Sequence, residues 1–378
     1  MLQCHGFAAY LVGGCVRDGL LGKTPHDWDI CTSAMPEETL RLFPNTVATG
    51  LRHGTVTVLC NCLSVEVTTF RAESSYSDHR HPDSVRFVSD LTADLARRDF
   101  TINAMALSSN GVLEDPFSGR DDLSAGILRA VGTPELRFQE DALRMLRAVR
   151  FAAQLGFRIE PETESAIRTC APLTSTLAAE RVRDEVEKTL LSPNPQMLGT
   201  MCEMDLVRQY ISPAIPVHWQ RLRAIVPERL RRWMALSILV TQAGATLTLL
   251  DALRLDKKTA LSCRACVALW KTAPRTELTW KAAIAQLGAE TAGQAADVIS
   301  ALEGTSDSAT VQQILQRDDC CTLRQLAVSG QDLQLLGLQG KDIGRALNAL
   351  LHHVWAHPEE NEKATLIHLI SQGGISND

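Results

Sequence analysis

The sequence lacks a net positive charge and lacks an uninterrupted apolar run of membrane-spanning length. Its formal charge is −6 over 378 residues. This charge excludes a uniformly basic nucleic-acid binder, so any RNA contact must come from local basic patches. Residues 233–250 carry no charged side chain, but polar residues such as Gln242 and Gly244 interrupt them. The stretch therefore predicts a pair of buried helices and no membrane contact.

The sequence also lacks paired metal-binding motifs. Its eleven cysteines are scattered, and Cys263 and Cys266 have no second pair for a zinc site. The histidines around Trp355 lack the spacing of a convincing metal site. The only His-Asp dipeptide is His26-Asp27, so no HD phosphohydrolase domain is expected. With no signal peptide, reduced cysteines and a cytoplasmic location are expected, and the length predicts two to four compact units.

One stretch near the N-terminus combines glycines with two acids. An apolar run ending at Val12 meets Gly13 and Gly14, and Asp27 and Asp29 follow. Glycines after a strand let the backbone approach a ligand, and the start of the next helix suits a phosphate. In a strand the two aspartates point to one face, where carboxylates about 4 Å apart repel by about 4 kcal/mol.

A hard cation such as Mg²⁺ would relieve that repulsion. Alone, a Gly-Gly pair is usually a turn, and an Asp-X-Asp motif is usually solvated or belongs to a glycosyltransferase. Together and in this order, they indicate an enzyme that handles nucleotides.

Residues 1–107 alternate between short strand and helix patterns. A helix is expected from Pro36 to Phe43, and strands at 54–60 and 63–71 are expected to form an antiparallel hairpin. Glu66 lies in the second strand, either at an edge facing water or as a third carboxylate near the metal. Residues 72–96 are polar and predict a long loop that is functional or disordered. An apolar helix is expected directly after Arg97 and Arg98.

A helical segment is expected over 137–151. Leu143, Leu146 and Ala153 form one apolar stripe, and Asp141, Arg144 and Arg147 follow at intervals of three on another face. An isolated pair of this spacing would be only a salt bridge worth about 0.3 kcal/mol.

Five segments resemble, in order, the motifs of class II tRNA nucleotidyltransferases and bacterial poly(A) polymerases. Residues 10–30 resemble motif A and 96–106 motif B. Residues 115–123 resemble the motif C hinge, and Glu140 to Arg144 match motif D, Glu-Asp-x-x-Arg. Residues 179–188 resemble motif E, read as supporting the neck. The resemblance covers about residues 8–190 and extends more faintly to the C-terminus.

The resemblance implies an α+β fold. A nucleotidyltransferase head with a polymerase β-like mixed sheet would span 1–107. An all-α neck (108–190), body (191–273) and tail (274–378) would follow, and the tail would hold the tRNA elbow.

The implied reaction is attack of an RNA 3′-hydroxyl on the α-phosphate of CTP or ATP, with release of pyrophosphate and no nucleic-acid template. Asp27 and Asp29 would hold Mg²⁺, and Glu66 would be a third catalytic carboxylate. The residues implied to bind the nucleotide are Gly14, Arg17 and Arg98 at the triphosphate, Asp99 at the ribose, Asp141 and Arg144 at the base, and Arg147 and Arg150 toward the triphosphate and helix-stabilising partners.

Several alternatives remain open. Residues 49–56 resemble the tRNA enzymes more than the poly(A) polymerases. The 72–96 loop has its full length, whereas CC-only enzymes tend to shorten it, so complete CCA addition is favoured over CC-only addition. A-only addition remains an alternative. A catalytically silent RNA-binding protein and a metal phosphohydrolase are further readings. The expected partners are tRNA, ATP and CTP, with no obligate protein partner. The arginines of 221–232 form a basic patch that either contacts tRNA or is merely a solvated face.

Overall fold

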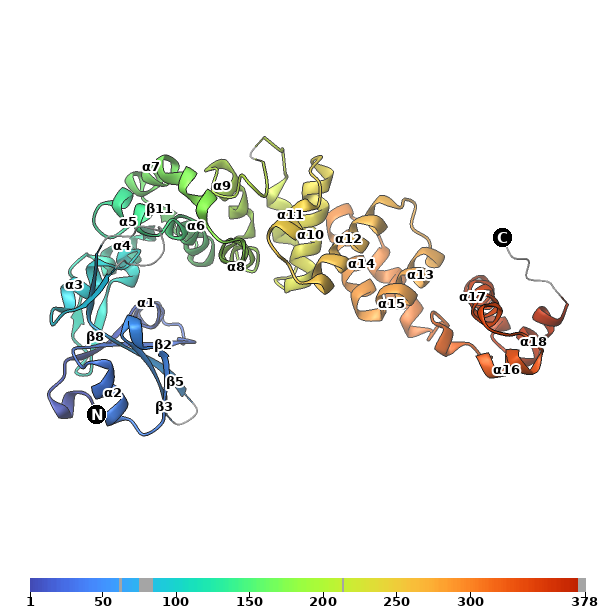
Figure 1. Cartoon of the computed structure of the whole chain (residues 1–378). Coiled ribbons are helices and arrows are strands. Elements are labelled where there is room, and N and C mark those ends of the chain that lie inside the picture. Colours follow the sequence, from blue (N-terminus) through green and yellow to red (C-terminus); the bar gives the residue numbers. More distant parts are fainter. Residues whose placement is uncertain (61–62, 75–83, 213, 373–378) are drawn as a thin grey trace. The chain divides into compact units, whose positions relative to one another are not determined.

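A seven-stranded mixed sheet dominates the N-terminal part of the computed structural model, which describes residues 1–60, 63–74, 84–212 and 214–372 (Figure 1). In spatial order its strands are β3 (Thr46–Gly50), β4 (Thr55–Cys60), β5 (Leu63–Thr69), β2 (Trp28–Thr32), β1 (Ala9–Val12), β8 (Ala106–Ser108) and β9 (Leu113–Glu114). Strands β2 and β5 pair in parallel, and the other neighbours are antiparallel. The expected hairpin is therefore confirmed as β4–β5.

Each face of this sheet is covered by its own apolar cluster. On one face Val12, Cys31 and Phe70 pack with Leu95, and on the other Val58 and Val67 pack with Leu2 and Ala34. Side chains alternate between faces along a strand, so Asp29 shares the face of Cys31. Glu66 is the partner of Asp29 in the β2–β5 ladder, and paired residues of neighbouring strands point to the same side. The register thus places both acids on one side of the sheet.

The helices of the N-terminal part include α1 (Gly14–Leu20), α2 (Pro36–Leu42) and α3 (Leu91–Ala96). The helix expected from Pro36 is confirmed as α2, with proline in its first turn and Glu38 bonded back to the Met35 amide.

Two expectations for this region are wrong. Residues 72–96 are not one loop, because β6 (Arg71–Ser74) pairs with β7 (Ser84–Phe87) and α3 follows. The loop residues from Tyr76 to Pro82 lie outside the described residues. The apolar stretch after Arg98 is also no α-helix. It forms a three-residue 3-10 turn at Thr101–Asn103 and then strand β8, because Ala104 and Ala106 fill the sheet core.

Beyond the sheet the chain is mostly helical. The helices are α4 (Gly119–Ala125), α5 (Pro134–Glu140), α6 (Leu143–Leu155), α7 (Pro161–Cys170), α8 (Ala179–Leu190) and α9 (Leu198–Glu203). A short parallel pair, β10 (Ile127–Leu128) with β11 (Arg158–Ile159), is an exception that the sequence pattern did not predict. The segment 137–151 is two helices rather than one, because the chain is extended at Asp141. The apolar stripe of Leu143, Leu146 and Ala153 is buried as expected.

The chain folds as two compact units, 1–219 with 252–254 and 220–251 with 255–378. The remaining helices are α10 (Arg229–Gln242), α11 (Thr248–Ala252), α12 (Lys257–Lys271), α13 (Glu277–Leu287), α14 (Ala289–Glu303), α15 (Asp307–Gln316), α16 (Gly330–Leu335), α17 (Lys341–Ala356) and α18 (Lys363–Ser371). The stretch 233–250 is confirmed as parts of two helices, α10 and α11. Among the described residues, none of the helices combines the length and apolar character that crossing a membrane requires.

Candidate functional site

Three carboxylates gather on one face of the sheet. Asp29 lies in β2, and its partner across the parallel β2–β5 ladder is Glu66. The expectation that Glu66 could lie at a sheet edge is wrong, because β5 is an inner strand between β4 and β2. The sequence pattern predicted that Asp27 and Asp29 lie in the same strand. This is wrong, because Asp27 immediately precedes Trp28, the first residue of β2. Asp27 and Glu66 are exposed, whereas Asp29 is partly buried.

These carboxylates carry uncompensated negative charge. Within the described residues, the side-chain oxygens of Asp27, Asp29 and Glu66 accept no hydrogen bond and form no ion pair. Burial raises the pKa of Asp29, and the charges of Glu66 and Asp27 raise it further, while the Arg98 guanidinium opposes them. Mutual repulsion and absent partners are the electrostatic conditions that favour binding of a cation.

Gly13 brings the backbone close to these groups. It adopts φ +78°, and a Cβ atom there would lie 3.0 Å from an Arg98 side-chain nitrogen and 3.7 Å from a carboxylate oxygen of Asp29. A side chain would therefore be both strained and crowded. At Gly14, the sequence-predicted position, a Cβ would only make ordinary contact with Arg17 at 3.7 Å. Gly13 is thus the glycine that this close approach requires.

A chain of hydrogen bonds links α1 to α6. Arg17 donates to Asn103 at 2.7 Å, and Asn103 donates to Asp99 at 3.1 Å. The other oxygen of Asp99 accepts from Arg147 at 2.6 and 2.9 Å. Burial alone would raise the pKa of Asp99, but Arg147 and Asn103 lower it to about 2. Asp99 is therefore ionised at neutral pH, and its carboxylate fixes the position of Arg147.

Most of the predicted nucleotide-binding residues line one cavity. Its volume is about 240 Å³, and its lining consists of Arg97, Arg98, Asp99, Asp141, Leu143, Arg144, Arg147 and Arg181. Five arginines and two aspartates give it a positive charge that suits a phosphorylated ligand. A larger cavity of about 480 Å³, near Arg168 and Arg208, contains none of the predicted residues. The smaller, charged cavity is the candidate site because its chemistry matches the sequence motifs.

Asp141 and Arg144 are held by specific partners in this cavity. Arg181, in the first turn of α8, forms an ion pair with Asp141 at 2.8 Å. Arg144 donates to a Glu140 carboxylate oxygen at 2.6 Å and to the Arg97 carbonyl at 3.0 Å. Asp141 is not on the helix face predicted for it, but at the break between α5 and α6, where it accepts from the Leu143 amide. The break lets a short carboxylate face Arg181.

Arg150 lies elsewhere. It is 7% exposed, forms an ion pair with Glu185 at 2.7 Å, and is absent from the cavity lining. Burial lowers its pKa to about 10, so it stays protonated at neutral pH. Its guanidinium carbon lies 3.9 Å from the centroid of the Phe151 ring. The structure thus gives Arg150 a packing environment between α6 and α8.

Sequence reasoning missed two residues of this region, Arg181 and Phe151, whereas Arg97 stands beside Arg98 and Asp99 in the motif B segment, which predicts ribose and phosphate contacts. Arg181 was included in a segment read as merely supporting. Phe151 lies beneath the guanidinium groups of Arg17, Arg147 and Arg150, at 5.2, 5.3 and 3.9 Å. Arg97 lines the cavity and pairs with Asp94 at 2.9 Å. The position of Arg181 in the first turn of a predicted helix could have indicated a role in the site, whereas the Phe151 contacts depend on tertiary packing.

The basic patch predicted over 221–232 is not a continuous exposed surface. Arg232 is 4% exposed and donates to the Val226 carbonyl. Arg231 pairs with Asp297 at 2.9 Å, and Trp233 is fully buried. Part of the patch therefore stabilises the packing around α10.

Three family models match successive parts of the chain. They are the poly A polymerase head domain at residues 9–129, a probable RNA and SrmB-binding site of polymerase A at 156–216, and a putative tRNA nucleotidyltransferase domain 2 at 226–370. Their order agrees with a nucleotidyltransferase head followed by helical segments.

Individual relatives agree with these matches. The CCA-adding enzyme of Limosilactobacillus fermentum is 40% identical over 96% of this chain and 92% of its own length, and that of Geobacillus kaustophilus is 37% identical over the same shares. The match to the Leuconostoc mesenteroides enzyme is 53% identical, but over 210 residues, so it spans about half of either protein (56% and 52%).

A solved structure extends the likeness to three dimensions. The crystal structure of the Bacillus stearothermophilus CCA-adding enzyme in complex with CTP matches with a TM-score of 0.84 and 34% identity, over 99% of this chain and 95% of that one. The expected α+β fold, a mixed-sheet head followed by helices, is confirmed by this match and by the head-domain model. The chain belongs to the family of CCA-adding enzymes, the tRNA nucleotidyltransferases.

Proposed function

We propose that the chain adds the 3′-terminal CCA to tRNA from CTP and ATP, without a nucleic-acid template, and releases pyrophosphate. Relatives matched over nine-tenths of their length are named for CCA addition, and a matched structure holds CTP. Within the chain, the observation that carries the proposal is the charged cavity in which Asp141 and Arg144 lie beside Arg98 and Arg147.

Nucleotidyltransferases as a family use divalent metal ions, and we propose Mg²⁺ for this chain, held by Asp27 and Asp29. The fit is supported by their hard oxygen donors, by their lack of partners among the described residues, and by the raised pKa of Asp29. When bound, the ion would activate the attacking hydroxyl and neutralise charge on the leaving pyrophosphate. Glu66, opposite Asp29, adds negative charge to this site.

The arginines near Gly13 would hold the triphosphate. Arg98 lies beside Gly13, and Arg17 and Arg147 are tied together through Asn103 and Asp99. Guanidinium groups match phosphate geometry through paired N–H donors. We propose that Gly14, Arg17, Arg98 and Arg147 bind phosphates, that Asp99 contacts the ribose, and that Arg150 stabilises α6 through Glu185.

Base selection would rest on Asp141 and Arg144. A carboxylate only accepts hydrogen bonds and a guanidinium only donates them, so the pair offers opposite patterns to the Watson–Crick edge of a base. Cytosine and adenine each present an amino donor and a ring-nitrogen acceptor on that edge, and other bases would leave these groups unpaired. Arg181 and Glu140 already hold the two side chains in place.

The division into head (1–107), neck (108–190), body (191–273) and tail (274–378), with the tail holding tRNA, is part of the same proposal. The third family model, over 226–370, supports a tRNA-specific role for the C-terminal half. A cytoplasmic location is also proposed, because that is where a bacterial tRNA-maturing enzyme meets its substrate.

The experiment that tests the function uses three tRNA transcripts, ending at the discriminator base, at C and at CC, each with one labelled NTP. We expect CTP to be added to the first two and ATP only to the third. Addition of ATP alone would identify an A-adding enzyme, and failure to add A would identify a CC-adding one. Long A tails on any RNA would identify a poly(A) polymerase, and no incorporation would overturn the enzyme proposal.

A further inference from the structure

The C-terminal end of α17 brings two histidines together. His353 lies in the last turn, and His357 is the residue after the helix ends at Ala356. Their rings have centroids 4.9 Å apart, as expected for residues one turn apart. Immediately afterwards, Pro358–Glu360 form a 3-10 turn that carries Glu359 and Glu360 back toward the helix end. Two imidazoles and two carboxylates are thus presented within eight residues of the chain.

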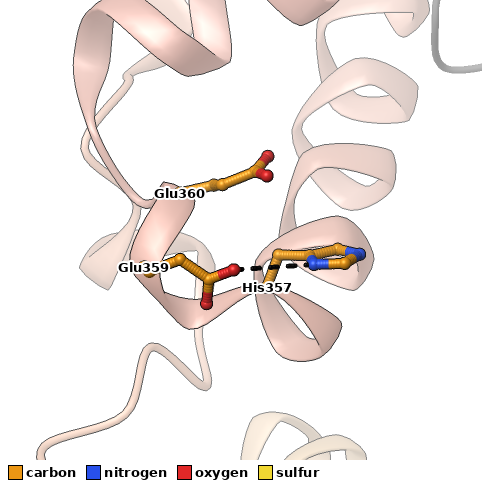
Figure 2. Close-up of side chains that lie close together, drawn as sticks. All are labelled: His357, Glu359 and Glu360. Atoms are coloured by element: carbon orange, nitrogen blue, oxygen red, sulfur yellow. Dashed lines mark ion pairs between the residues drawn. The ribbon is translucent and has the colours of Figure 1, made fainter.

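Three of these side chains converge on one point (Figure 2). One ligand atom from each of His357, Glu359 and Glu360 lies within 4.8 Å of the other two, and Nδ1 of His357 is 3.7 Å from a Glu359 carboxylate oxygen. Among the described residues, no other set of three or more histidine, cysteine or acidic side chains is gathered so closely. Asp27, Asp29 and Glu66 do not meet that limit.

His353 supports the group from outside. Its Nε2 atom is 2.7 Å from Oε2 of Glu360, and this contact holds the Glu360 carboxylate from outside the group. Metal-binding carboxylates are commonly oriented by such an outer hydrogen bond. The His353 ring therefore fixes the position of the Glu360 carboxylate beside His357 and Glu359.

The electrostatics of the position also favour a cation. With neutral imidazoles, Glu359 and Glu360 leave a charge of −2 at the end of α17, a helix of sixteen residues. The dipole of α17 adds partial negative charge at its C-terminal end, where the Trp355 carbonyl accepts a hydrogen bond from the Lys281 ammonium. In the described residues, the ion pairs of Glu359 and Glu360 are formed with these histidines only.

We propose that His357, Glu359 and Glu360 form a Zn²⁺-binding site that is separate from the acids of the sheet. An imidazole nitrogen with carboxylate oxygens suits Zn²⁺, whereas Mg²⁺ and Ca²⁺ prefer oxygen ligands alone. Ligand distances of about 2.0–2.2 Å place neighbouring tetrahedral ligand atoms about 3.4 Å apart. His357 and Glu359 are exposed and Glu360 is half-buried, so their side chains would adjust to this spacing on binding, and water would complete the coordination.

The expectation that the histidines around Trp355 lack metal-site spacing concerned the histidines by themselves. The spacing of the histidines alone omitted the two glutamates, which the 3-10 turn brings back to the helix end. A bound ion would join that turn to α17, whose residues Leu350 and Val354 form an apolar cluster with Leu366 of α18. We expect the site to stabilise the packing of α17 against α18.

The test is a zinc titration of the full-length chain by isothermal calorimetry, after removal of metals and with excess Mg²⁺ present. The wild type is compared with His357→Gln and with the matched control His352→Gln. His352 is exposed, lies outside the group and stacks on Trp355. We expect His357→Gln to lose one zinc equivalent, or to bind it at least about 10-fold more weakly, while His352→Gln behaves as the wild type.

Equal zinc binding by the wild type and His357→Gln would overturn the proposal, as would loss of the same equivalent in His352→Gln. A Glu359→Gln, Glu360→Gln double variant serves as a second test, because it keeps the histidines and removes the charge. It is expected to lose the same equivalent. Far-ultraviolet circular dichroism without zinc, expected to be unchanged in all variants, separates loss of the site from loss of the fold.

Discussion

Arg181 forms an ion pair with Asp141 at 2.8 Å, joining the first turn of α8 to the break between α5 and α6. Both side chains line the charged cavity and are less than a quarter exposed. In this pair the guanidinium determines where the Asp141 oxygens point. Under the proposed role of Asp141 in base selection, Arg181 would influence which base is accepted without itself touching the base.

We predict that Arg181→Ala lowers the preference for the correct nucleotide by about 10-fold, through misplacement of Asp141. Arg181→Lys is expected to restore part of the preference, because lysine keeps the charge but not the paired geometry. The measurement is kcat/KM for CTP and ATP on each tRNA end. Lys188→Ala, an exposed position on the same helix, is the control and should leave both values unchanged.

Arg144→Ala is expected to reduce discrimination between C and A by about 10- to 100-fold, since one bidentate base contact is worth about 1–3 kcal/mol. Its three acceptors, Glu140 and the carbonyls of Arg97 and Arg137, would lose their donor. Affinity for tRNA, measured by filter binding, should change little. Unchanged nucleotide fidelity in this variant would argue against a role in base selection.

A pair of glycines tests the close approach at the start of α1. Gly13→Ala and Gly22→Ala both place an alanine at positive φ, +78° and +70°, and both are expected to lose stability. Gly13, with ψ −134°, lies outside the left-handed helical region and should lose more than about 1–2 kcal/mol, the cost typical of that region. Only at Gly13 would the new Cβ meet Arg98 and Asp29, because nothing lies within 4 Å at Gly22. We predict a large fall in kcat for Gly13→Ala alone. Similar kcat values in both variants would indicate backbone strain rather than crowding of the site.

The Asp99–Arg147 pair gives a pH-dependent prediction. The pKa of Asp99 is about 2 in the folded chain against 3.8 for the free group. Its charged form therefore contributes stability above pH 4, about 2 kcal/mol, and the contribution falls as the pH drops toward 2. About 1 kcal/mol should be lost by pH 3. Urea unfolding at pH 7 and pH 3 measures this loss. The difference in free energy of unfolding between wild type and Asp99→Asn should be smaller at pH 3 than at pH 7. An equal difference at both pH values would contradict the lowered pKa of Asp99.

Much of the head could be predicted from the sequence. The β-branched runs of β4 and β5 and the proline at the start of α2 carry local signals that the packed sheet does not override. The segments that failed were decided by tertiary contacts. Residues 101–106 are apolar enough for a helix, but Ala104 and Ala106 pack into the sheet core and the chain forms β8. At the break, Asp141 pairs with Arg181, which is forty residues away, so local spacing could not show this contact.

In the candidate site, too, features with a local sequence signal could be predicted, and features decided by tertiary contacts could not. The motif spacing identified most of the residues that line the cavity, because each motif is short and local. The spacing could not show that Gly13, rather than Gly14, is the glycine that the close approach requires, since only the packed structure shows which glycine lies next to Arg98. Nor could spacing reveal that Arg150 pairs with Glu185 while Arg147, three residues earlier, lines the cavity.

The measurement that tests the account most directly is labelled CTP incorporation by Asp29→Asn, with tRNA ending at the discriminator base. Asn keeps the shape of the side chain but removes the charge, and we predict loss of incorporation with tRNA binding retained. Because burial and the charges of Glu66 and Asp27 raise the Asp29 pKa, the ionised carboxylate costs stability once the pH exceeds its folded pKa. The variant should therefore be at least as stable as the wild type at pH 7. Incorporation at the wild-type rate would contradict the catalytic role of the acids on this sheet.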